Sequence, residues 1–283
     1  MRYLVFSLAV TALLWPTALR ADDSFTVVTY NIRYASPHDG KDVWSERKES
    51  VAQFLGDFDI FGLQEVTAGQ RDDLDERLGL FESYGLGRDD GKRGGEAAPI
   101  YFLRSRFTAQ SKGTIWLSES PETIGKKGWD AALPRTMTYL VLLDKQTDKT
   151  FLVANTHFDH RGVQARLESG KLIRRWLDQR DIQLPTIVMG DFNCLPDSDP
   201  YRALTTNDSP SPLADARTLA KSPVVGPTST WNGFQQIVPD RIIDHVFVRG
   251  PIEIVELETH DPKTSDGRFA SDHLPVRVLL RIK

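Results

Sequence analysis

Asp191 and Asn193 close a stretch whose residue types suit the activation of a water molecule. Residues 186–189 are apolar or favour β structure, follow Pro185 and stop at Gly190, which predicts a buried strand that ends at an active surface. Side chains two residues apart on an extended chain point the same way, so a carboxylate and a carboxamide would share one pocket. Such a pair can orient a water, accept its proton and lie beside a hard cation that prefers oxygen ligands. The same residue types also suit a plain polar turn.

Similar polar side chains end other apolar runs of the chain. Asn31 is the polar residue of the β-branched and aromatic run 25–32, and a buried carboxamide is costly unless it is hydrogen-bonded or meets a ligand. Glu65 ends the next apolar run, just before a helix that the capping-box spacing of Thr67 and Gln70 predicts. Each such residue alone suits a structural role, but burying so many without function would require compensation for each. The full set is Asn31, Glu65, His157, Asp191, Asn193, Asp244, Asp272 and His273.

These side chains need a framework of strands and helices that brings the strand ends together. Runs rich in β-branched and aromatic residues predict strands, and apolar residues at helical spacing predict helices. The predicted strands are 25–32, 59–66, 99–103, 138–144, 151–156, 186–190, 242–248 and 276–282, and the predicted helices begin near Ser45, Thr67, Val163 and Asp199. We expect 104–137 and 205–235 to be irregular. The stretch 85–98 is rich in glycine and charged residues, so it is expected to be a mobile loop. It is not interpreted as a phosphate-binding glycine motif, because such a motif requires a preceding strand and none is predicted there.

Composition and the first residues indicate an ordered, exported protein. The chain has 283 residues, of which 40% are hydrophobic and 26% charged, enough for a sizeable core. Residues 3–14 form an apolar run after Arg2, and small residues follow up to Ala21, a pattern typical of a secretory signal peptide, with a buried N-terminal helix as the alternative. We predict a signal peptide over 1–21 and a secreted or periplasmic monomer. No later stretch approaches the roughly 20 apolar residues that a membrane helix needs, so no stable membrane insertion is expected.

The charge balance bears on the partners of the mature chain. Removing residues 1–21 would take away two of the 35 basic residues, which leaves 33 against 39 acidic residues and a formal charge of −6. An acidic surface has no general attraction for nucleic acid, although a local basic patch could still bind it. Basic residues on the predicted helix 163–177 are interpreted as a solvated face. Cys194 is the single cysteine, so the fold depends on its core and not on an intramolecular disulfide.

Six short motifs follow one another in a characteristic order. They are Thr29-Tyr30-Asn31-Ile32, Leu63-Gln64-Glu65-Val66, Asn155-Thr156-His157, Gly190-Asp191-Phe192-Asn193, Ile243-Asp244-His245-Val246 and Ser271-Asp272-His273-Leu274-Pro275-Val276. This set resembles the endonuclease/exonuclease/phosphatase superfamily, the deoxyribonuclease I-like fold. The resemblance implies one α/β domain over 22–283, a four-layer sandwich in which two mixed β-sheets lie face to face with helices outside. The segment 155–160 is closer to the deadenylase and nocturnin branch than to the abasic-site endonucleases, which have a tyrosine near the His157 position.

The same resemblance implies a metal site and a water-activating pair. Glu65 matches the principal metal ligand of the superfamily, Asn31 its close neighbour and Asp272 a further metal ligand. Oxygen ligands of this kind fit Mg²⁺ or Mn²⁺ as the cofactor. Asp191 matches the residue that positions or deprotonates the attacking water, and Asn193 the residue that orients the water or the phosphate.

The resemblance also implies roles for five further residues. Asp244 matches the acid that holds His273, in the way that a carboxylate fixes an imidazole tautomer in other hydrolases. His157 would contact the phosphate or the leaving group, with Glu96 as its acid partner. Arg135, in the Pro-Arg pair of the long irregular stretch, would contact the phosphate of the substrate.

The function implied is a secreted, Mg²⁺- or Mn²⁺-dependent phosphoesterase that hydrolyses phosphate esters by in-line attack of an activated water. The substrate favoured is a nucleic acid or nucleotide phosphodiester. The alternative is a phosphatase or phospholipase-like enzyme acting on a small or lipid head-group phosphate. A non-catalytic binding protein on the same scaffold is a third reading, and a binder would not need a water-activating pair. The number of metals, and an endo- or exonucleolytic mode of action, stay open.

Overall fold

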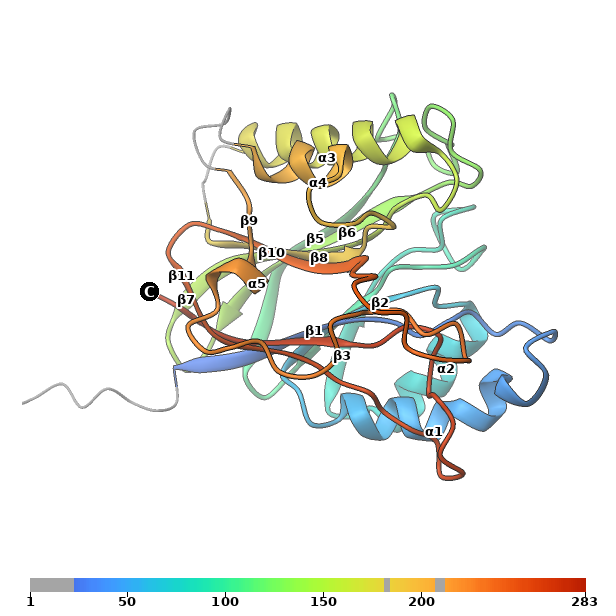
Figure 1. The fold of residues 1–283 in the computed structure, drawn as a ribbon. Coiled ribbons are helices and arrows are strands. Elements are labelled where there is room, and N and C mark those ends of the chain that lie inside the picture. Colours follow the sequence, from blue (N-terminus) through green and yellow to red (C-terminus); the bar gives the residue numbers. More distant parts are fainter. Residues whose placement is uncertain (1–22, 181–183, 207–211) are drawn as a thin grey trace, which may run out of the picture.

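The computed structural model describes residues 23–180, 184–206 and 212–283 (Figure 1). The predicted signal peptide, residues 1–21, therefore lies outside the described residues. Two six-stranded sheets make up the centre of the molecule. The first sheet has the order β11 (Ile252–Thr259), β12 (Val276–Ile282), β1 (Ser24–Asn31), β2 (Ile60–Gln64), β4 (Ile100–Leu103) and β3 (Phe81–Tyr84). The second has the order β5 (Phe107–Trp116), β6 (Thr136–Asp144), β7 (Lys149–His157), β8 (Thr186–Asp191), β10 (Asp244–Arg249) and β9 (Ala214–Asp215).

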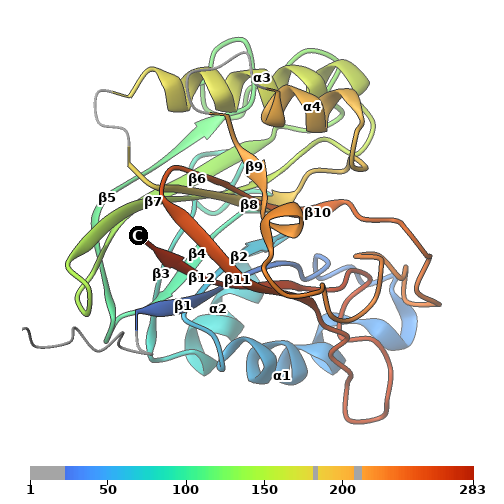
Figure 2. The same cartoon turned by 60° about the vertical axis from the view of Figure 1, so that its left-hand side comes forward.

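Each sheet is mixed and carries helices on its outer face. The pairs β1/β2 and β7/β8 are parallel, and the other neighbouring strands run antiparallel. Figures 1 and 2 show one pair of helices outside each sheet. Helices α1 (Trp44–Leu55) and α2 (Ala68–Arg77) cover the first sheet, and α3 (Val163–Asp178) and α4 (Asp199–Thr205) cover the second. The short elements are η1 (Gly40–Asp42) and α5 (Ala216–Leu219). The predicted four-layer α/β sandwich is confirmed.

Alternation along the inner strands explains where the polar residues lie. In β8, Ile187 and Met189 pack into the core between the sheets, whereas Val188 packs toward the outer helices. Successive side chains of a strand point to opposite faces, so Asp191 continues the Ile187 and Met189 face. The same period places Asn31 on the face of Val27 in β1, which also belongs to the core between the sheets. The polar strand ends thus lie at one end of the core that both sheets share.

A buried amide bridge joins the two sheets below these strand ends. The Nδ2 of Asn155, in β7, donates to the backbone oxygens of Leu63 at 2.8 Å and Pro99 at 2.9 Å. Its Oδ1 accepts from the Nε2 of Gln64, in β2, at 2.7 Å. Gly62 leaves the room for this bridge, because a Cβ built there would lie 2.7 Å from the Cγ of Asn155. The hydrogen bonds satisfy amides that would otherwise be costly to bury, and they fix the spacing of the sheets.

Some predictions about local structure are corrected, and others are confirmed. The stretch 104–137 was expected to be irregular, but it contains β5, and strands β3 and β11 were not predicted. Residues 85–98 form a compact loop, in which the amide of Arg88 donates to the oxygen of Glu96 at 3.0 Å. The capping box of Thr67 and Gln70 is confirmed, while α1 begins after Val43 without a side-chain cap. Within the part of the chain that the structure describes, none of the helices combines the length and apolarity that crossing a membrane requires.

Candidate active site

Asp191 is the centre of the site. Its Oδ2 accepts from the Nδ2 of Asn31 at 3.0 Å and lies 3.4 Å from the Nε2 of His157 and 3.8 Å from the Nε2 of His273. Its Oδ1 accepts from the backbone amide of Asn193 at 2.9 Å. Asn31 ends β1 of the first sheet, and His273 lies in the segment that leads into β12. His157 and Asp191 end β7 and β8 of the second sheet. The structure therefore brings together five of the residues that the sequence singled out.

The backbone around Asp191 explains why it is held in this place. Gly190 has a φ of +155°, and a Cβ added there would lie 2.1 Å from the backbone oxygen of Thr156 on the neighbouring strand. Only glycine allows this close approach of β7 and β8. Asn193 has a φ of +46°, a left-handed conformation that asparagine tolerates better than most residues. This turn directs its amide toward Asp191, while its Nδ2 donates to the oxygen of Phe158 at 3.2 Å.

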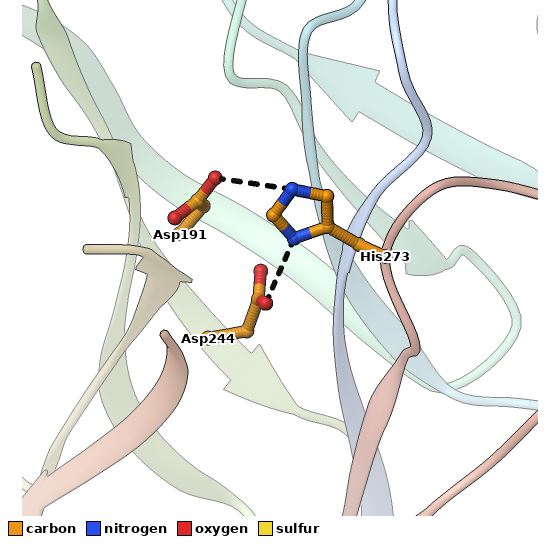
Figure 3. Close-up of side chains that lie close together, drawn as sticks. All are labelled: Asp191, Asp244 and His273. Carbon is orange, nitrogen blue, oxygen red and sulfur yellow. Dashed lines mark hydrogen bonds and ion pairs between the residues drawn. The ribbon is translucent and has the colours of Figure 1, made fainter. Parts of the chain in front are cut away.

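Asp244, His273 and Asp191 form a compact group, shown in Figure 3. The Nδ1 of His273 lies 2.9 Å from the Oδ2 of Asp244, and the register of β8 and β10 places Asp244 opposite Asp191. Burial alone would lower the pKa of His273, but the charges of Asp244 and Asp191 outweigh it and raise this pKa to about 10. His273 is therefore an imidazolium at neutral pH, with Nδ1–H donating to Asp244 and Nε2 facing Asp191.

The acidity of Asp191 suits a proton acceptor. Burial, reinforced by the charge of Asp244, raises the pKa of Asp191 to about 7. A general base works best when its pKa lies near the working pH, because it is then both ionised and basic enough to accept a proton. The ligand atoms of Asp191, Asp244 and His273 all lie within 4.8 Å of one another. Both nitrogens of His273 face carboxylates, so we interpret this group as a chain of proton donors and acceptors and not as a metal centre.

The residues around Glu65 fit a hard divalent cation. Glu65 follows β2 with a φ of +63°. Its Oε1 accepts from the Nδ2 of Asn31 at 3.1 Å and its Oε2 from the amide of Tyr34 at 2.9 Å. Burial raises the pKa of Asp272. The charge of His273 lowers this pKa, and the negative charge of Glu65 raises it further. A divalent cation would offset the repulsion between the two carboxylates, and oxygen donors are those that Mg²⁺ and Mn²⁺ prefer. Glu65 and Asp272 would therefore hold it.

Asn31 has a different orientation from that of a metal ligand. Its Nδ2 donates to both Glu65 and Asp191, and its Oδ1 accepts from the amide of Arg33 at 3.0 Å. In this geometry the amide positions two carboxylates from opposite sheets. Asn31 was predicted as a metal-site residue together with Glu65 and Asp272. It lies beside Glu65, but its side chain presents a donor to the site and its oxygen accepts from the backbone.

The predicted pairing of Glu96 with His157 is not the one in the structure. The carboxylate of Glu96 accepts two hydrogen bonds from the guanidinium of Arg88, both at 2.8 Å. The planar fork of arginine matches a carboxylate with two parallel bonds, and the compact loop brings both residues together. His157 lies against Asp191 instead. Burial lowers the pKa of His157 well below its usual value, and the charges of Arg135 and Arg88 lower it further.

Three residues beside Arg135 were not singled out from the sequence. The Nε of Arg135 lies 3.3 Å from the Oδ2 of Asp159, and its Nη2 lies 3.0 Å from the Nδ1 of His160. Arginine stays protonated, so this Nδ1 accepts and the neutral His160 carries its proton on Nε2. Asp159 and His160 directly follow His157, and their nearness to its strand end is the signal that could have identified them. Arg88 had no such signal, because the loop that carries it is rich in charge of both signs.

A cavity of about 700 Å³ adjoins the catalytic cluster. Asn193 contributes to its lining, next to Leu195, Val163 and Leu167 and to the polar side chains of Gln164 and Ser198. The side chains of Val163 and Leu195 are 67% and 48% exposed. The cavity is much larger than a phosphate group, so it leaves room for the organic part of an ester whose phosphorus lies near Asp191.

Replacing Asp244 with Asn should move the pH profile of this site. The carboxylate of Asp244 raises the pKa values of both His273 and Asp191, so its loss lowers both. If Asp191 must be ionised and His273 protonated, kcat/KM rises with pH through the first pKa and falls through the second. We expect both limbs of the profile to move to lower pH in Asp244→Asn. Hydrolysis rates between pH 5 and 10.5 measure this, and limbs that keep the wild-type positions would contradict the assignment.

This chain is similar, over most of its length, to two solved structures from Bacteroides. The structure is similar to an endonuclease/exonuclease/phosphatase from Bacteroides vulgatus, with a TM-score of 0.86 and 36% identity, covering 92% of this chain and 99% of that chain. It is also similar to a mannosyl-6-phosphatase from Bacteroides thetaiotaomicron, with a TM-score of 0.82 and 34% identity, covering 90% and 99% of the two chains.

The human nocturnin catalytic domain shares the fold at 18% identity, with a TM-score of 0.69 and coverage of 92% and 94%. The sequence model of the Endonuclease/Exonuclease/phosphatase family matches residues 28–273, a span that contains every residue of the cluster around Asp191. The chain therefore belongs to the Endonuclease/Exonuclease/phosphatase family.

Proposed function

We propose that this protein is a divalent-metal-dependent phosphoesterase that releases phosphate from a small phosphomonoester, with a sugar phosphate as the favoured substrate. One observation carries the proposal. A buried carboxylate, Asp191, lies between the His273 imidazole, which Asp244 fixes, and an amide that also holds Glu65. Burial, which raises the pKa of Asp191 to about 7, agrees with this placement. A binding protein has no need of a proton acceptor held in this way, whereas hydrolysis by an activated water requires one.

Each residue has a defined task in this mechanism. The ionised Asp191 orients a water molecule and accepts its proton as the water attacks phosphorus. The turn at Asn193 holds Asp191 through the backbone amide of Asn193, which donates to Oδ1 of the carboxylate. His273, fixed by Asp244, supplies positive charge beside the reacting group, and charge placed where negative charge develops lowers the barrier. Glu65 and Asp272 would hold a Mg²⁺ or Mn²⁺ ion, which would supply Lewis-acid stabilisation of negative charge.

The substrate proposal rests on three supports. The mannosyl-6-phosphatase that resembles this chain over nearly its whole length is named for a sugar phosphate. The cavity at Asn193 has room for an organic group and includes polar side chains such as Gln164 and Ser198. The mature chain, with residues 1–21 removed, would have a formal charge of −6, which does not favour general binding to a nucleic acid. These supports favour a monoester over the nucleic acid or nucleotide diester that the motifs alone favoured.

The proposal includes the place of action. Residues 1–21 carry the pattern of a signal peptide, so we propose that the mature enzyme begins near Asp22 and acts in the periplasm or outside the cell. Substrates there would be phosphorylated sugars of extracellular origin. N-terminal sequencing of exported protein is the direct check of this part.

A panel of phosphate esters tests the substrate class. The purified protein, with Mg²⁺ or Mn²⁺ added, would be assayed on hexose 6-phosphates, p-nitrophenyl phosphate, nucleoside monophosphates, bis(p-nitrophenyl) phosphate, oligonucleotides and phospholipid head-group phosphates. We expect kcat/KM for a hexose phosphate to exceed that for any diester by about tenfold or more, a difference of about 1.4 kcal/mol in barrier. Internal cleavage of oligonucleotides at a higher kcat/KM than monoester hydrolysis would instead make the protein a nuclease.

A further inference from the structure

We propose that Arg88 and Arg135 together form a subsite for a doubly charged, terminal phosphate, and that this subsite makes the enzyme select monoesters over diesters. The inference rests on the proposed phosphoesterase function and adds the residues that set its specificity. Arg88 is the new element, because neither the sequence motifs nor the comparisons give it a role.

The two arginines lie near His157, close enough for the charge of each to lower its pKa. Arg135 immediately precedes β6, which pairs with β7 so that Met137 lies opposite Thr156. This register places Arg135 beside the end of β7, where it contacts Asp159 and His160. Arg88 reaches the site through its pair with Glu96. Bridge pairing of Val66 with Ala97 holds that part of the loop against the end of β2, next to Glu65.

Both guanidinium groups are buried and incompletely paired. Arg135 and Arg88 are 4% and 8% exposed. Among the described residues, the Nη1 of Arg135 and the Nε of Arg88 have no hydrogen-bond partner. A buried donor without an acceptor costs free energy, more so when it is charged. The oxygens of a bound phosphate would satisfy both donors, which explains why two such groups are kept in one place.

The subsite has one carboxylate for each arginine, so the neighbouring acids do not give it a net negative charge. Glu96 is fully engaged by the fork of Arg88. Asp159 accepts from the amides of Arg161 at 2.9 Å and Gly162 at 2.7 Å as well as from Arg135. Each arginine thus has one carboxylate and keeps one free donor. The charges of both arginines also act on His157, whose lowered pKa keeps it neutral, so the subsite adds donors and no further negative charge.

The number of charges on the substrate decides the selectivity. A phosphate monoester has a second ionisation near pH 6, so at pH 7.5 it carries about two negative charges and three free oxygens. A diester carries one charge and has an organic group on one of those oxygens. Arginine donors bind charged oxygens more strongly than neutral ones and fix their geometry. A monoester can therefore place a charged oxygen at each free N–H group and still present a third oxygen to the rest of the site, while a diester has one charge and two free oxygens to share between this subsite and the rest of the site.

The first test replaces Arg88 with Met, which keeps bulk in the buried position and removes the donors. Rates would be measured on p-nitrophenyl phosphate and bis(p-nitrophenyl) phosphate, which share a leaving group, with Mg²⁺ or Mn²⁺ saturating. We expect kcat/KM for the monoester to fall by about tenfold to 100-fold, as for the loss of one hydrogen bond to a charged group. The diester rate should change by less than about threefold, and the inhibition constant of inorganic phosphate should rise with the monoester loss.

Two further variants separate this role from a structural one. Arg93 lies on the same loop in an exposed pair with Asp72, so Arg93→Met is the matched control and should keep the wild-type ratio of monoester to diester rates. Glu96→Gln keeps the charge of Arg88 and should preserve most of that ratio even if the loop loses stability. Equal losses on both substrates in Arg88→Met, or an unchanged ratio, would overturn the proposal. Wild-type protein that hydrolyses neither ester with metal present would instead refute the phosphoesterase function itself.

Discussion

Asp191→Asn is expected to lower kcat by on the order of 10²-fold or more while leaving the fold intact, as for removal of a positioned general base. The amide has nearly the same shape as the carboxylate, and its single oxygen can still accept from one of the two donors, Asn31 or the backbone amide of Asn193, which bind different oxygens of Asp191. It cannot accept a proton from water. Single-turnover and steady-state rates on the preferred ester measure the loss, and KM should change much less than kcat.

Thermal unfolding and metal binding provide the controls for this variant. Burial of the ionised Asp191 is costly, so its replacement by a neutral amide should change the melting temperature only modestly. A folded Asp191→Asn protein with the wild-type rate would show that Asp191 is a structural turn residue and would remove the mechanism. A second variant, His273→Ala, should lose activity to a comparable degree, because the same reacting group would lack its neighbouring positive charge.

Removal of divalent metal should abolish hydrolysis, and added Mg²⁺ or Mn²⁺ should restore it. The expectation rests on Glu65 and Asp272, whose carboxylates lie close enough for the charge of one to raise the pKa of the other. A cation that binds only the folded state also raises its melting temperature as its concentration increases. Calorimetry or thermal shift therefore follows binding without any assay of activity.

Glu65→Gln tests which residue holds the cation. The change keeps the size of the side chain and a hydrogen-bond acceptor for Tyr34, but it removes one ligand charge. We expect both the metal concentration for half-maximal activity and that for half-maximal thermal stabilisation to rise by about tenfold or more. Full activity in excess chelator would refute the metal requirement, and an unchanged requirement in Glu65→Gln would place the cation elsewhere.

The inner strands of the fold could be predicted from the sequence because their pattern reports burial directly. The strand β8 is buried at every position, and such a strand is a continuous apolar run. The edge strands gave a weaker signal. Strand β5 exposes Thr108 and the residues from Gln110 to Lys112 to solvent, and β11 alternates isoleucine or leucine with glutamate. One face of an edge strand is free to be polar, so the strand is not the continuous apolar run that marks an inner strand.

The residues of the site also differ in how clearly the sequence indicated them. Asp191, Asp244 and His273 stand at or near the ends of recognisable strands, so residue type and position singled them out, and the family resemblance implied their roles. The partner of Glu96 could not be inferred in this way. It depends on the closure of a 14-residue loop, residues 85–98, and on the preference of a guanidinium fork for a carboxylate. Contacts between loops are set by the folded backbone and leave no period in the sequence.

The amide bridge between Asn155 and Gln64 has a consequence for how this enzyme would fail. Asp191, the proposed proton acceptor, ends β8 in one sheet, and Glu65, the proposed metal ligand, directly follows β2 of the other. Activity therefore depends on the registry of two rigid bodies as well as on the side chains themselves. A separation of the sheets too small to melt either one would already pull Asp191 away from Asn31 and Glu65. Catalysis is thus the most sensitive reporter of cooperative contact between the two halves of the molecule, and inactivation should precede the loss of secondary structure.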